Sequence, residues 1–167
     1  MNRESLQNKI AAWSSEVEFS AGPVLADEEA GVKASPGTQY LEVIIKPSLL
    51  LEFAEKLRND KEMQFNFMFS LTCVDFADHF MMVYHLRSIE FEHELVLKVK
   101  IEDKEKPVVE TLCHIWRTAE YHEREVYDLF GVVFTNHPDL RRILLDDDWK
   151  GYPLRKDYVD PVNIISL

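Results

Sequence analysis

The residues best equipped for chemistry lie between positions 120 and 158, where acids, bases and aromatic residues are packed more closely than elsewhere in the chain. His122 and Glu123 begin like the zinc motif H-E-x-x-H, in which two histidines share one face of a helix. Val126 stands where the second histidine should be. The motif is therefore incomplete and does not by itself predict a zinc enzyme.

Two other kinds of active site draw on neighbouring residues. A looser metal site made of His122, Glu125 and His137, as a stand-alone metal-dependent hydrolase would need, stays open as an alternative. A cysteine nucleophile needs a histidine that activates the thiolate, and Cys113 precedes His114 directly. Adjacent residues of a helix point in different directions, so this pair does not favour a catalytic thiol.

Glu123 is unusual because of its place in a predicted helix. Residues 119–130 contain no Pro or Gly, and Gly131 follows where a helix C-terminus needs a residue that tolerates positive φ. Upstream, Pro107 can begin an earlier helix, and apolar residues recur every three or four positions from there to Phe130. This stripe places Glu123 on the buried face, where a carboxylate needs a cation or several hydrogen-bond donors.

We therefore expect Glu123 to form a buried or interface ion pair, although a bend near Tyr121 would return it to water. The candidate cations are Arg124, Arg141, Arg142, Arg155 and Lys156. For Arg124 an alternative stays open, in which it bridges Glu120 and Asp128 at i−4 and i+4 on an exposed helix face.

The order of residues from position 123 onward resembles the signature of the C subunit of respiratory complex I, the NADH:quinone oxidoreductase, also called its thirty-kilodalton subunit family. The chain matches that signature at Glu123-Arg124-Glu125, Asp128, Leu129-Phe130, His137, Arg141 and Ile143-Leu144. The segment from Asp148 to Tyr158 also resembles the family's tail. Asp146 and Tyr152 depart from it, since members often carry Pro and His there.

The resemblance implies a non-catalytic peripheral-arm subunit that scaffolds the large quinone-site subunit, called the D subunit, and neighbours the iron–sulfur subunits. It implies no cofactor in this chain, whereas the parent complex uses NADH, FMN, iron–sulfur clusters and quinone and pumps protons. The implied location is the cytoplasmic side of the bacterial inner membrane. An equivalent small subunit of a membrane-bound nickel–iron hydrogenase is the alternative.

The resemblance and the charge pattern together nominate one set of residues as partner interface or structural signature. They are Glu123, Arg124, Glu125, Asp128, His137, Arg141, Arg142, Trp149, Arg155, Lys156 and Tyr158. Trp and Tyr are favoured at protein interfaces, so we expect the tail aromatics to meet a partner. The alternative is that the tail folds back on its own domain.

The composition of the chain limits its partners. The net charge of −11 at pH 7 argues against nucleic acid, whose phosphates require Lys and Arg. Cys73 and Cys113 are forty residues apart and no C-x-x-C pair occurs, so we expect neither an iron–sulfur cluster nor a structural zinc. No apolar run is long enough to span a bilayer and no signal peptide is visible, so we expect an intracellular protein that meets membranes only through partners.

Hydrophobic periodicity predicts an α+β fold. We expect an N-terminal helix over 5–13, strands over 39–45, 65–73, 80–86, 95–101 and 132–134, a helix from Pro47 and a helical hairpin over 107–130. These elements favour an antiparallel or mixed sheet of about four to five strands with helices on one face. The predicted domains are 1–38, an N-terminal helix and acidic connector; 39–136, the α+β domain; and 137–167, an extended partner-binding tail.

Overall fold

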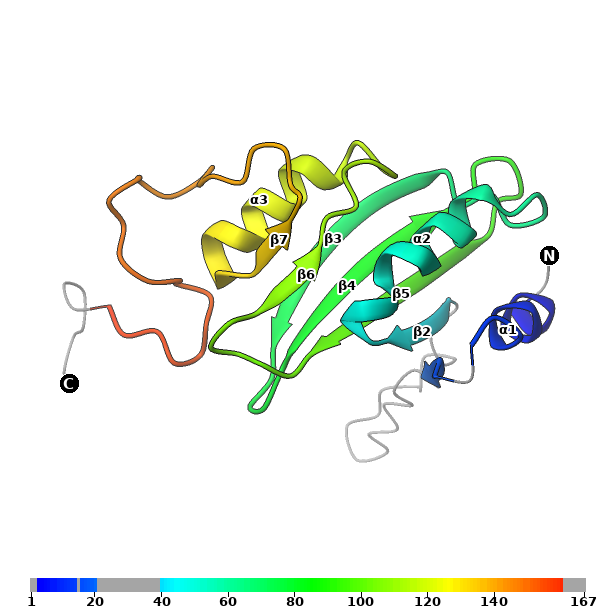
Figure 1. Cartoon of the computed structure of the whole chain (residues 1–167), viewed down its shortest axis with the longest axis horizontal. Coiled ribbons are helices and arrows are strands. Elements are labelled where there is room, and N and C mark those ends of the chain that lie inside the picture. The colour runs from blue at the N-terminus through cyan, green and yellow to red at the C-terminus, as the bar shows by residue number, and fades with distance from the viewer. Residues whose placement is uncertain (1–2, 15, 21–39, 161–167) are drawn as a thin grey trace, which may run out of the picture.

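A five-stranded mixed sheet forms the centre of the computed structural model, which describes residues 3–14, 16–20 and 40–160 (Figure 1). Its spatial order is β1-β2-β5-β4-β3, with β2 parallel to β5 and the other neighbours antiparallel. The strands are β1 (Glu18–Ser20), β2 (Leu41–Ile45), β3 (Phe67–Asp75), β4 (Phe80–Arg87) and β5 (Glu94–Ile101). The predicted α+β class with a mixed sheet is confirmed.

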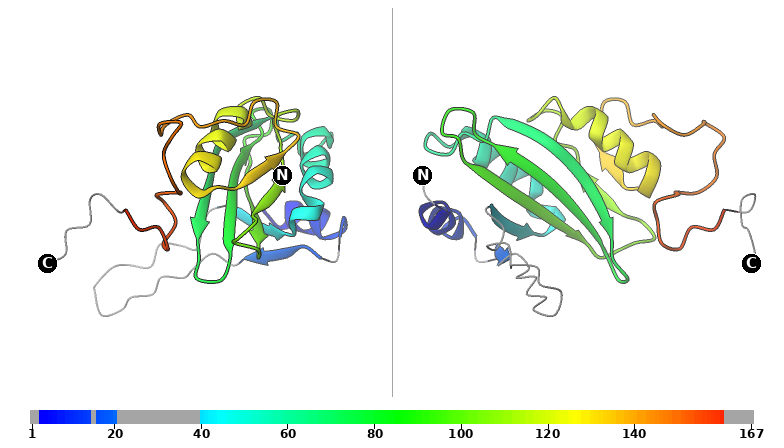
Figure 2. Two further views of the ribbon diagram at one scale, coloured as in Figure 1. Left: turned by 60° about the vertical axis from the view of Figure 1, so that its left-hand side comes forward. Right: turned by 180° about the vertical axis from the view of Figure 1, so that it is seen from behind.

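The helix that follows β2 covers the part of the sheet that lies on the right in Figure 1. Pro47 begins a short 3-10 turn, η2 (Pro47–Leu49), which continues into α2 (Leu50–Asn59). The buried stripe of α2 consists of Leu50, Phe53, Ala54 and Leu57, which are positions predicted from apolar spacing. This helix lies on the same face of the sheet as α3 (Ala119–Phe130), and the view from behind shows the opposite face without either helix (Figure 2).

The segment before α3 differs from the predicted helical hairpin. Residues 107–118 do not form a helix, because β6 (Val108–Glu110) pairs in parallel with β7 (Val133–Thr135). The N–H of Thr111 continues this pairing to the carbonyl of Thr135 at 3.1 Å, which a helix would not allow. The β-branched Val108 and Val109 favour the strand. The predicted α3 is confirmed, and Gly131 ends it with φ +74°.

The direction of side chains along β3 also differs from prediction. Simple alternation groups Phe67 and Phe69 with the buried Leu71, yet these two rings are 40% and 41% exposed while Met68 is fully buried. The pairing of β3 with β4 shifts between Met68 and Ser70. Such a bulge moves one residue out of the alternation, so the sides of the strand exchange at this point.

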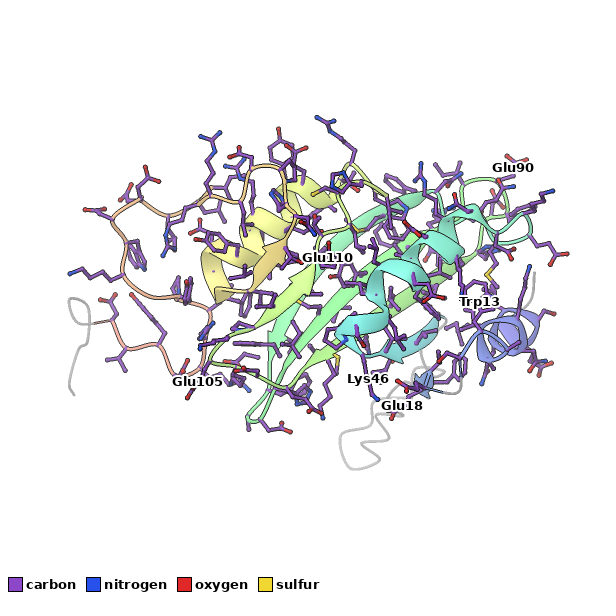
Figure 3. All side chains as sticks on the ribbon, in the orientation of Figure 1. Trp13, Glu18, Lys46, Glu90, Glu105 and Glu110 are labelled. Atoms are coloured by element: carbon purple, nitrogen blue, oxygen red, sulfur yellow. The ribbon has the colours of Figure 1, made fainter. Side chains whose placement is uncertain are left out.

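The N-terminal segment packs onto this core. α1 (Arg3–Ala11) buries Leu6 and Ile10, and Trp13 meets the ring of Phe53 edge-on at 5.4 Å (Figure 3). β1 lies inside the predicted connector, where no strand was expected, while the rest of that connector, residues 21–39, lies outside the described residues. No helix within the described part of the chain is long and apolar enough to cross a membrane. The predicted domain boundaries stay a prediction.

Candidate partner-docking surface

The tail, residues 137–160, is attached to α3 through a buried aspartate. Asp128 is fully buried, and its Oδ2 accepts the backbone N–H groups of Ile143, Leu144 and Leu145 at 3.0, 2.7 and 2.9 Å. Burial alone would raise the pKa of Asp128, but these donors and the Arg142 guanidinium hold that pKa below its ordinary value. Asp128 is therefore a fixed negative charge around which the tail turns.

Arg142 links Asp128 to the far part of the tail. Its Nη1 donates to Asp128 Oδ1 at 2.7 Å and to the Asp128 carbonyl at 3.0 Å. Its Nη2 donates to the carbonyls of Trp149 and Gly151 at 3.2 and 3.3 Å. The guanidinium also lies 5.5 Å from the centre of the Tyr152 ring. One side chain thus fixes the loop between residues 142 and 152 at both ends.

Arg155 holds the other side of Tyr152. Its Nε donates to the Phe130 carbonyl and its Nη1 to the Lys104 carbonyl at 3.2 Å. Its guanidinium lies 4.8 Å from the Tyr152 ring centre and 5.0 Å from that of Phe80. Tyr152 is therefore in cation–π contact with two arginines.

The Tyr152 ring packs directly against Gly131. A Cβ atom at Gly131 would collide with the Tyr152 ring, and the positive φ of this residue would strain any other side chain. The C-cap of α3 and the docking of the tail therefore require the same glycine.

A second carboxylate anchors the end of the tail to the sheet. Asp75, at the end of β3, is 5% exposed, and its Oδ2 accepts the N–H of Lys156 at 2.8 Å. Lys104 pairs with Oδ1. Burial would raise the pKa of Asp75, yet Lys104 and the Lys156 amide lower it. The N–H of Leu154 adds a bond to the Leu129 carbonyl at 3.1 Å.

Arg124 points to the tail instead of to the carboxylates of its own helix. It is 9% exposed and donates to the carbonyls of Arg141 and Arg142 at 3.2 and 3.1 Å. Its guanidinium lies 5.9 Å from the Tyr121 ring centre. The alternative in which it bridges Glu120 and Asp128 is wrong, because Asp128 pairs with Arg142.

Glu123 is fully buried, as the apolar stripe predicted. The expectation of an arginine or lysine partner is wrong. The Glu123 carboxylate instead accepts hydrogen bonds from the Leu112 N–H at 2.8 Å, from the Thr111 hydroxyl and from the Cys113 thiol at 3.4 Å. His137 Nε2 lies 3.9 Å from Oε2. Burial raises the pKa of Glu123 above its ordinary value, because these donors offset the lost hydration only in part.

The remaining predicted residues lie on the surface. Glu125 and Lys156 are exposed, and the 70% exposed side chain of Arg141 pairs with Asp139 at 3.0 Å. Trp149 is 36% exposed. Tyr158 is half-buried against Gly151.

Sequence reasoning missed Thr111, Asp75 and the role of Tyr152. Asp75 could have been found, because it continues the inward alternation of Leu71 and Cys73 and so places a carboxylate towards the core. Thr111 gives no such signal, since its contact with Glu123 depends on a turn that the sequence did not predict.

The tail presents several apolar side chains to solvent. Leu144 is 63% exposed, Leu154 52% and Val159 66%, and Ile143 and Trp149 are 38% and 36% exposed. Ordered backbone with exposed apolar side chains is typical of a protein interface. The contacts of the tail with Asp128 and Asp75 show that it packs on its own domain, whereas contact with a partner stays a prediction.

The comparisons with known proteins agree on one family. The family described as respiratory-chain NADH dehydrogenase, 30 Kd subunit, matches residues 43–162. The chain is 44% identical over 120 residues to the C subunit of NADH-quinone oxidoreductase from Roseiflexus sp. (strain RS-1), covering 70% of this chain and 68% of the relative. It is also 44% identical over 113 residues to the C/D subunit of NADH-quinone oxidoreductase from Phocaeicola vulgatus, covering 67% of this chain and 21% of that protein.

Two solved structures have similar folds. The trypsin-resistant fragment (1-134) of Nqo5 superposes with a TM-score of 0.63 at 26% identity and covers 84% of this chain and 100% of the fragment. A chain of the membrane-bound sulfane sulfur reductase, an archaeal respiratory membrane complex, gives a TM-score of 0.73 at 24% identity and covers 95% of this chain and 86% of its own. The second likeness concerns the fold alone.

Proposed function

Because the chain belongs to the family of the 30 Kd subunit of respiratory-chain NADH dehydrogenase, we propose that it is the C subunit of a proton-pumping NADH:quinone oxidoreductase and docks onto the D subunit. In this role it scaffolds the quinone-site polypeptide in the peripheral arm, on the cytoplasmic side of a bacterial inner membrane. The observation that carries the proposal is the tail, which is ordered by polar contacts while its apolar side chains face solvent.

Preorganisation supports a docking role. A free tail loses conformational entropy when it binds, and each side chain that is fixed beforehand lowers that cost. Asp128, Arg142 and Arg155 hold the tail through hydrogen bonds to backbone groups. They leave the apolar side chains of Leu144 and Leu154 available for a partner.

The name of one relative supports the D subunit as that partner. In the Phocaeicola vulgatus protein, the C and D subunits share a single name and chain, and this chain matches about a fifth of its length. Polypeptides that are fused in one organism and separate in another are commonly held together by direct contact.

The chemistry of the described residues supports a scaffolding role. Burial raises the pKa of the Cys73 and Cys113 thiols to about 12, so both are protonated at neutral pH and are poor nucleophiles. Within the described residues, His122 and Glu125 join no cluster of metal-ligating side chains with His137. In this proposal NADH, FMN, iron–sulfur clusters and quinone bind to other subunits.

Co-purification from native membranes tests the proposal. A tagged chain carrying Leu144→Ser and Leu154→Ser should lose the D subunit, because two apolar contacts of the interface are removed. The matched control is Ile89→Ser, which also removes a 64% exposed side chain but lies in the β4–β5 turn beside Glu90, far from the tail (Figure 3).

Each outcome decides the proposal. Recovery of the D subunit with the wild-type chain and the control, but not with the double variant, would support it. Equal recovery with the double variant would contradict docking through the tail. A hydrogenase large subunit in place of the quinone-site polypeptide would overturn the assignment to the quinone reductase.

A further inference from the structure

Three side chains with metal-binding atoms meet beneath the start of the tail. Cys113 comes from the turn before α3, Glu123 from α3 itself and His137 from the turn after β7. One ligand atom of each lies within 4.8 Å of the others. The Cys113 Sγ and His137 Nε2 atoms lie 3.4 and 3.9 Å from the same carboxylate oxygen, Glu123 Oε2.

These separations are close to those of a tetrahedral metal site. With the usual zinc bond lengths to sulfur, nitrogen and oxygen, neighbouring ligand atoms lie roughly 3.4 to 3.6 Å apart. The sulfur–oxygen separation of 3.4 Å already fits, whereas the nitrogen–oxygen separation of 3.9 Å has to close by about 0.5 Å. Magnesium and calcium prefer sites made of oxygen alone, so this set selects Zn²⁺ and similar cations that bind sulfur.

Two further donors hold the carboxylate in place. The Leu112 N–H donates to Oε1 at 2.8 Å, and the Thr111 hydroxyl donates to Oε2. Hydrogen bonds of this kind orient ligands and contribute to metal affinity. The His137 side chain is fully buried, whereas Cys113 is half-exposed and provides an approach from solvent.

The electrostatics of the cluster favour a cation. Glu123 is fully buried and no Lys or Arg of the described residues pairs with it. The ionised Glu123 carboxylate therefore has no Lys or Arg side chain in the described part of the chain to compensate it. A divalent cation would neutralise this charge and would deprotonate the thiol on binding.

We propose that Cys113, Glu123 and His137 form a binding site for Zn²⁺, which would join the turn before α3, the helix and the root of the tail. None of the spacings is a zinc motif, since the ligands are ten and fourteen residues apart. This proposal departs from the expectation, drawn from cysteine spacing, that the chain has no structural zinc.

Metal binding requires two protons of the site to move. His137 Nδ1 accepts the Asp139 N–H at 3.0 Å, and Nε2 donates to the Glu120 carbonyl at 3.0 Å. For Nε2 to bind the metal, its proton moves to Nδ1, so the bond to the Glu120 carbonyl breaks and the Asp139 N–H loses its acceptor. The thiol proton of Cys113 is released to solvent. Zinc affinity therefore increases with pH.

Cobalt titration of the purified full-length chain tests the site. After treatment with a chelator, we expect one Co²⁺ per chain, with a thiolate-to-cobalt charge-transfer band and the visible bands of tetrahedral coordination. Zn²⁺ should displace the cobalt. Cys113→Ser should abolish the charge-transfer band and weaken Zn²⁺ binding at least about tenfold, whereas His122→Asn and Glu125→Gln, which alter neighbouring surface residues, should change neither.

Folding of the variants is checked by circular dichroism in the presence of chelator. If Cys113→Ser is misfolded, His137→Gln serves as the second variant and should lose tetrahedral coordination while the fold persists. Absence of stoichiometric cobalt, a charge-transfer band that survives Cys113→Ser, or equal loss in His122→Asn would overturn the proposal.

Discussion

The body and the tail of this chain are held by different forces. The body, which comprises the described residues before His137, rests on buried apolar side chains such as Phe65, Phe80 and Leu97. The tail has few buried side chains and is held by carboxylates and guanidinium groups that bind backbone atoms. Apolar burial depends little on pH, whereas these polar contacts require particular protonation states. Because of this difference, we expect the tail to detach under conditions in which the body stays folded.

Asp128→Ala should weaken the attachment of the tail more than any other substitution considered below. It removes the acceptor of three amides and the partner of Arg142, and the loss of one member of a buried pair costs about 3 kcal/mol. Hydrogen exchange of the Leu144 and Leu145 amides should accelerate about a hundredfold. Asp157→Ala, at an exposed acid of the tail, is the matched control. Unchanged exchange in Asp128→Ala would show that the tail is held by other contacts.

Gly131→Ala should have the next largest effect. Positive φ at this residue costs another side chain about 1 to 2 kcal/mol, and the added Cβ also displaces Tyr152. Urea unfolding measures the total loss. A double-mutant cycle with Tyr152→Ala separates the two causes, because only the collision disappears when the ring is absent. Complete additivity in that cycle would mean that Tyr152 does not rest on Gly131.

Acid should release the tail before it unfolds the body. The pKa values of Asp128 and Asp75 are lowered, so their contribution is present above the ordinary value near 3.9 and is lost as pH falls through the lowered values. Glu123 acts in the opposite direction, since its pKa is raised and its stabilising effect decreases as pH rises. The indole NMR signal of Trp149 follows the tail, while far-ultraviolet circular dichroism follows the body. Coincident transitions would contradict independent release.

Arg141→Ala should have the smallest effect. Its side chain is 70% exposed and pairs with Asp139 at the surface, so we expect a change within about 0.5 kcal/mol in urea unfolding. Arg142→Ala, at the adjacent position, should destabilise the tail more, because Arg142 contacts a buried aspartate. Similar losses in the two variants would remove the distinction between exposed and buried arginines on which the comparison depends.

The predictions that succeeded depended on local patterns. The apolar spacing in α2 and the Gly131 cap of α3 specify these helices from neighbouring residues alone. The alternation in β4 and β5 and the short connections between β3, β4 and β5 gave the antiparallel hairpins. Burial of Glu123 also followed from its position in the stripe.

The predictions that failed depended on distant partners. Apolar spacing over residues 107–118 suggested a helix, but Val108 to Glu110 pair with β7, more than twenty residues later. The partner of Glu123 was expected to be an arginine or a lysine, whereas the donors are the Thr111 hydroxyl and the Leu112 amide. These donors become available only because that segment is not helical.

The sequence by itself determined the α+β class, the α2 and α3 helices, the hairpins of the sheet and the family. The tertiary structure alone decided the β6–β7 pairing, the exposure of Phe67 and Phe69 and the attachment of the tail by Asp128 and Arg142. The reason is physical. Helix caps and side-chain periodicity act between near neighbours, whereas strand pairing, bulges and buried charges depend on groups that only the folded chain brings together.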